Sequence, residues 1–61
     1  MLDSNTYDKV KLLHELSCIA WFIKHHGLED TKNAGDQQTH NLFAALQQDL
    51  ERYVEELKKS L

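Results

Sequence analysis

The segment 43–57, FAALQQDLERYVEEL, decides the fold. Its large apolar residues recur at steps of 3 and 4, which is a heptad pattern with a positions at 43, 50 and 57 and d positions at 46, 53 and 60. Most of the intervening positions carry charged or amide side chains. The pattern therefore predicts one amphipathic helix over about 36–60, and Asp36 is the expected N-cap.

A second apolar stripe precedes this segment. Leu12, Leu16, Ile19 and Ile23 follow one another at steps of 4, 3 and 4, and neighbouring apolar residues widen the stripe. We predict a first helix over about 5–26. Lysine and histidine residues at 24–26 followed by Gly27 are typical of a helix end, so we expect Gly27 in the left-handed conformation and a connection over 27–35.

These elements predict a single all-α domain over 1–61, a two-helix antiparallel hairpin. The second half of the first helix is apolar on all sides, and such a helix needs to be buried. One partner helix cannot bury it, so we expect two hairpins to form a homodimeric four-helix bundle. The expected core and dimer interface comprise Leu12, Leu16, Ile19, Trp21, Phe22, Ile23, Phe43, Leu46, Leu50, Tyr53 and Leu57. The alternative for Trp21 and Phe22 is a docking patch for a different protein.

Composition narrows the functional classes. The chain has 61 residues, a net charge of −3, no proline and one cysteine. A chain this short has a marginal core, and one cysteine excludes an internal disulfide. We expect neither a secretory leader nor a membrane span, and a cytoplasmic location. The negative charge disfavours anionic partners such as nucleic acid.

Two groups of side chains have the chemistry of metal ligands. His14 and Cys18 are spaced i and i+4 on one helix face, and a two-fold axis could join two such pairs into a zinc site. His25, His26 and His40 are predicted near the tip of the hairpin. For both groups the simpler interpretation is structural. Cys18 is a small hydrophobe, and the histidines at 25 and 26 complement the helix dipole. We therefore predict no metal and no cofactor.

Catalysis is not expected, because a pocket, a glycine-rich loop and an oxyanion hole are all missing from the predicted hairpin. The predicted architecture resembles that of the small plasmid RNA-binding regulators of the Rop type, which are dimeric helical hairpins. The likeness concerns architecture alone, since the basic residues are scattered and no motif matches. We expect a non-enzymatic homodimer that binds another protein as a regulatory or adaptor module. A Rop-like RNA- or DNA-binding regulator and a metal-binding bundle using His14 and Cys18 remain alternatives.

Overall fold

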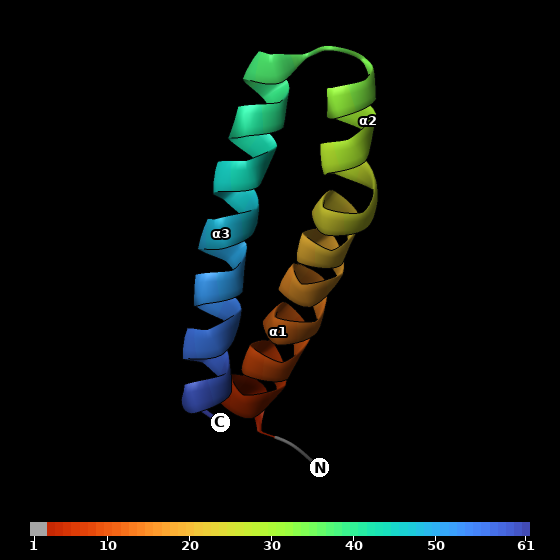
Figure 1. Ribbon diagram of the computed structural model, residues 1–61. Helices are drawn as coiled ribbons and strands as arrows, with labels where there is room; N and C mark the ends of the chain where they lie inside the picture. The colour runs from red at the N-terminus through yellow and green to blue at the C-terminus, as the bar shows by residue number, and fades with distance from the viewer. Residues whose placement is uncertain (1–2) are drawn as a thin grey trace.

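The computed structural model describes residues 3–61, which form a helical hairpin (Figure 1). Helix α1 (Ser4–Phe22) passes through a π-helical turn, η1 (Ile23–Gly27), into helix α2 (Leu28–Asn33), and these three form one rod. Helix α3 (Gln37–Lys59) returns beside this rod, so both termini lie at one end of the hairpin and the turn at the other. The predicted all-α hairpin is confirmed, with no strand among residues 3–61.

Aspartate side chains begin both long helices. Asp3 Oδ1 accepts a hydrogen bond from the backbone N–H of Thr6 at 2.7 Å, and Asp36 Oδ1 accepts one from the N–H of Thr39 at 3.1 Å. These bonds satisfy amides that lack a partner in the first turn of a helix. Hydrogen bonds from Thr6 lower the pKa of Asp3, and hydrogen bonds from Thr39 lower the pKa of Asp36. The N-cap predicted at Asp36 is therefore confirmed.

The two rods meet along one line of side chains, which we call the seam. Of the apolar side chains between residues 3 and 61, only Ala20 and Ile23 are less than a tenth exposed. The other seam residues are half-buried. From the first rod the seam takes Lys9, Leu13, Leu16, Ala20, Ile23, Leu28 and Thr31, and from α3 it takes His40, Phe43, Gln47, Leu50, Val54 and Leu57.

The seam spacing explains the π-helical turn. Seam side chains on the first rod advance by 4 or 3 residues up to Ile23, and the next seam side chain is Leu28, 5 residues on, with the buried Gly27 beside it. The N–H of Leu28 donates to the carbonyl oxygen of Ile23, which is the i to i−5 bond of a π-turn. The wide turn thus absorbs one extra residue and keeps both α1 and α2 facing α3.

Gly27 does not end the helix, and the predicted connection over 27–35 is wrong. Its φ is −62°, it is buried, and the helix continues to Asn33. Gly27 serves close packing instead, because a Cβ atom there would lie 3.1 Å from Cδ2 of Phe43. The left-handed residue is Gly35, with φ of 71°, in the short turn 34–36 that joins the rods.

Hydrogen bonds tie α2 to α3 near this turn. Nδ1 of His40 lies 2.9 Å from the carbonyl oxygen of Leu28 and 3.1 Å from the hydroxyl of Thr31. A carbonyl oxygen only accepts, so its contact places a proton on Nδ1. The Thr31 hydroxyl also lies 2.8 Å from the Gly27 carbonyl oxygen, to which it donates. His40 is therefore part of the hairpin's own structure.

Replacing Gly27 with valine tests the close contact. Gly27→Val should lower the free energy of unfolding by about 1–3 kcal/mol, since its Cβ atom would lie 3.1 Å from Cδ2 of Phe43 and the ring would have to shift. Lys24→Val, exposed in the same π-turn, carries the same β-branch without that overlap and is the matched control. Urea unfolding followed by circular dichroism measures both. Equal losses in the two variants would show that Gly27 is not needed for packing.

Leu50 tests the seam. Leu50→Ala should destabilise the protein by about 1–3 kcal/mol, because it removes a half-buried side chain from the centre of the seam on α3. Glu51→Ala changes an exposed neighbour and should stay within about 0.5 kcal/mol of the wild type. Thermal melts in which the two variants behave alike would mean that the seam runs along a different side of α3.

Candidate interaction surfaces

Each long helix carries a second row of large apolar side chains, which the hairpin leaves exposed. Leu12 and Ile19 of α1 are 52% and 46% exposed, and Leu46 and Tyr53 of α3 are 43% and 53% exposed. The two residues of each pair are seven positions apart, which is about two helical turns, so each pair forms a row along its helix. Leu42, at 65% exposed, extends the α3 row toward the turn.

The two rows lie on the same side of the hairpin. On α1, Leu12 and Ile19 fall on one flank of the seam, whereas Ser17 and Trp21 fall on the other, since successive residues are about 100° apart. On α3, Leu46 and Tyr53 are likewise opposite Glu51 and Glu55. Ser17, Trp21, Glu51 and Glu55 line one shared groove. The two apolar rows therefore share the opposite side, and we call this side the open face, made of Leu12, Ile19, Leu42, Leu46 and Tyr53.

The open face is large for so small a protein. Its five side chains are each about half exposed. A large apolar side chain has roughly 200 Å² of surface when fully exposed, so the five together present roughly 500 Å² of apolar surface. That area is near the upper limit for the largest apolar patch on a typical monomer. The whole chain exposes 4807 Å². A compact monomer of this mass exposes about 4,100 Å².

Acidic side chains border the open face. By helical spacing Asp8 and Glu15 lie along its outer edge on α1, and Asp49 and Glu56 along its outer edge on α3. Arg52 pairs with Asp49 at 3.6 Å and lies 4.9 Å from the centre of the Tyr53 ring. Lys11 pairs with Glu15 at 4.0 Å, and Lys59 pairs with Glu56 at 3.7 Å. Charges of both signs therefore border this face.

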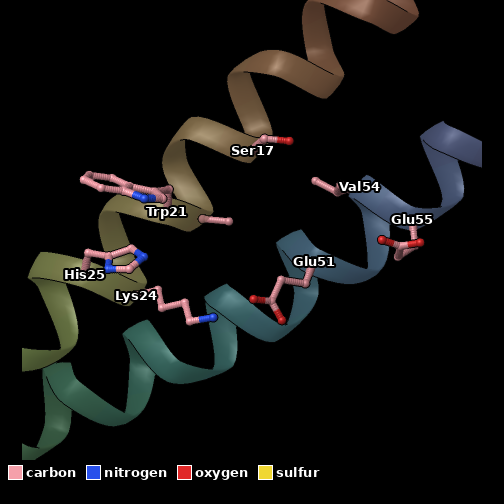
Figure 2. A pocket seen from close by; sticks show the side chains of 8 residues that line it. Ser17, Trp21, Lys24, His25, Glu51, Val54 and Glu55 are labelled. Atoms are coloured by element: carbon pink, nitrogen blue, oxygen red, sulfur yellow. The ribbon is translucent and has the colours of Figure 1, made fainter.

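The groove on the opposite side has a volume of about 460 Å³ and is open to solvent (Figure 2). Ala20 and Val54 form its floor, since both are seam residues. In Figure 2 the Lys24 side chain extends from its helix toward Glu51 of α3. Charges of both signs therefore lie across the groove from one another. Its other lining residues are Ser17, Trp21, His25 and Glu55.

Aromatic rings gather on the outer side of the first rod at the π-turn. The ring of Trp21 lies 4.6 Å from that of His25 and 5.5 Å from that of His26, and the ring of Phe22 lies 5.6 Å from that of His26. Trp21 and Phe22 are 56% and 57% exposed, so the hairpin does not bury them as the predicted core would. These four residues form an exposed cluster, which we call the aromatic cluster.

The His14–Cys18 pair and the three other histidines lie at different places in the hairpin. Sγ of Cys18 and Nε2 of His14 are 3.6 Å apart, both exposed on α1. Helical spacing places them on the side facing away from α3, which is also away from the open face. His40 lies in the seam, whereas His25 and His26 pack on the aromatic rings. Between residues 3 and 61, no three His, Cys, Asp or Glu side chains are placed to hold one metal ion.

The predicted interface residues divide between these surfaces. Leu16, Ile23, Phe43, Leu50 and Leu57 lie in the seam. Leu12, Ile19, Leu46 and Tyr53 lie on the open face, and Trp21 and Phe22 in the aromatic cluster. The sequence did not reveal the groove or the contact of Gly27 with Phe43. The one sequence signal for the groove was the pair of small residues Ser17 and Ala20, which are three positions apart on α1 and both line it.

No protein-family model matches the chain, and searches of curated proteins and of solved structures find no match either. Among residues 3–61, no helix combines the length and the apolar character that crossing a membrane requires.

Proposed function

We propose that this protein is a non-enzymatic interaction module that pairs with a second copy through the open face and binds another protein in a regulatory or adaptor role. The observation that carries the proposal is the open face itself, where five large apolar side chains lie together in solvent. An apolar patch of this size is typical of a protein interface.

A second copy suits this face for two reasons. The face supplies roughly 500 Å² of apolar surface, more than half of the roughly 800 Å² per partner that a standard interface buries. The heptad spacing of its two rows is also the spacing with which helices of a four-helix bundle interlock. Closing two such faces together would complete a core that the single hairpin lacks.

The aromatic cluster supports the second part of the proposal. Trp21 and Phe22 lie outside the open face, so pairing leaves part of their surface exposed. Tryptophan is among the residues that most often dominate the binding energy of protein interfaces. We assign the contact with another protein to this cluster, with Trp21 as its anchor.

Replacing Ile19 tests the open face. Ile19→Glu should weaken self-association at least about a hundredfold, because each copy loses roughly 1.5–3 kcal/mol of apolar burial and gains a charge there. Val10→Glu is the matched control. Val10 is also β-branched and on α1, and is 42% exposed, but lies on the opposite flank of the seam.

Sedimentation velocity at tens of micromolar, with circular dichroism, measures both variants. Wild type and Val10→Glu should sediment as dimers, and Ile19→Glu as a 7.1 kDa monomer with reduced helicity. A wild-type protein that is monomeric at this concentration would contradict the proposal. So would an Ile19→Glu variant that dimerises as well as the control.

The alternative of a nucleic-acid regulator receives little support from the charges. Lys11, Arg52, Lys58 and Lys59 each lie within 4.0 Å of a carboxylate on the same helix, and the chain has seven lysine and arginine residues in all. Lys9 donates to the Ser60 carbonyl oxygen. Most of the lysine and arginine side chains thus contact groups of the protein itself, and they form no basic stripe on its surface.

A gel-shift titration at about 150 mM salt separates the two functions, because electrostatic binding to nucleic acid falls steeply with salt. The probes are a labelled RNA hairpin and a DNA duplex of similar length. We expect no binding below micromolar concentration to either. Sub-micromolar binding to one of them would favour a Rop-like regulator over a protein-binding module.

A further inference from the structure

The His14–Cys18 pair lies outside every surface used so far. Sγ of Cys18 and Nε2 of His14 are 3.6 Å apart, and the structure gives neither atom another polar contact among residues 3–61. Both side chains are exposed on the side of α1 that faces away from α3 and from the open face. The sequence alone favours a structural interpretation of this pair, but neither side chain packs in the seam.

The distance between the two donor atoms fits a metal ion. Zinc takes thiolate sulfur at about 2.3 Å and imidazole nitrogen at about 2.0–2.1 Å in tetrahedral geometry, which sets the two donors about 3.6 Å apart. The separation of Sγ and Nε2 has this value. Ligands at i and i+4 on one helix face are also the spacing with which a helix holds zinc through two side chains. One hairpin thus supplies two ligands of a zinc site.

Two ligands leave a zinc ion half coordinated. Structural zinc sites are closed by four protein ligands. Between residues 3 and 61, no third His, Cys, Asp or Glu side chain is placed to join this pair. The two missing ligands therefore have to come from outside the chain, and the exposed position of the pair on α1 leaves it accessible to a second copy.

We propose that one zinc ion joins the His14–Cys18 pairs of two copies through the outer sides of their α1 helices. A two-fold axis through the metal supplies each type of ligand twice, so the site has two sulfur and two nitrogen donors. This donor set is one of the common structural zinc sites. The site is incomplete in one copy and complete in two.

The chemistry of the proposed site balances without a further ion. Each Cys18 thiol releases its proton to solvent when the sulfur binds the metal, and each His14 binds through the lone pair of its neutral ring. One Zn²⁺ and two thiolates have no net charge together, so two protons leave for each ion bound. Zinc has no redox chemistry, and no oxidant or reductant takes part. Zinc binding thus adds a second mode of self-association, separate from the open face.

Cobalt(II) is the spectroscopic probe for this site. Metal-free protein is titrated with Co²⁺ in the presence of a phosphine reductant, which keeps Cys18 as a thiol. A bound thiolate gives a charge-transfer absorption in the near ultraviolet, and tetrahedral cobalt gives strong visible bands. We expect both to saturate at one ion for every two chains. Saturation at one ion per chain, or absence of the charge-transfer absorption, would overturn the proposed site.

Sedimentation velocity with and without Zn²⁺, in the same reductant, tests the link between copies. Zinc should at least double the sedimenting mass of the wild type. His26→Gln is the matched control, because it removes an exposed histidine of the same rod outside the pair, and it should respond as the wild type does. Cys18→Ser and His14→Gln should each keep their metal-free mass.

Cys18→His is the rescue variant. It rebuilds a pair of ligands at i and i+4 with two nitrogen donors, so it should regain the zinc response without the charge-transfer absorption of bound cobalt. Zinc that leaves the wild-type mass unchanged, or that acts equally on Cys18→Ser, would overturn the proposal. The mass of the metal-free wild type reports the pairing through the open face, so failure of that pairing is seen separately.

Discussion

Two helices that lie side by side share one line of contact, and a line cannot enclose side chains on all sides. This constraint governs the whole structure. Only Ala20 and Ile23 are nearly buried among the apolar side chains of the described chain, although each helix carries apolar residues over a much wider arc. The surplus lies on the open face and in the aromatic cluster. This surplus is the apolar surface that remains available for contacts with other molecules.

The sequence predicted the hairpin well, because heptad spacing and capping residues are local signals. Asp36 caps α3 as expected, and Phe43, Leu50 and Leu57 face the first rod in the seam. The d positions behave differently: Leu46 and Tyr53 turn to the open face, and His40, Gln47 and Val54 complete the seam. The apolar stripe of α3 is wide enough for two contact lines, so its period could not tell which edge meets the first rod.

Gly27 shows why the remaining features could not be predicted. Lysine and histidine residues followed by glycine are the ordinary local signal of a helix end. At this site the backbone stays helical and the glycine admits the Phe43 ring, a requirement set by a residue sixteen positions later. The groove and the aromatic cluster have the same origin, since both depend on how the two rods face each other. Local patterns carry no information about such contacts.

The π-turn also has a consequence for changes in the length of the chain. If one residue were removed between positions 24 and 26, Leu28 would become the fourth residue after Ile23, and the seam of the first rod would be an unbroken heptad from Lys9 onward. Both parts of the rod would keep their present sides toward α3. The same deletion elsewhere in either helix would rotate all later residues by about 100°. This turn is therefore the place in the long helices where a one-residue deletion is compatible with the fold.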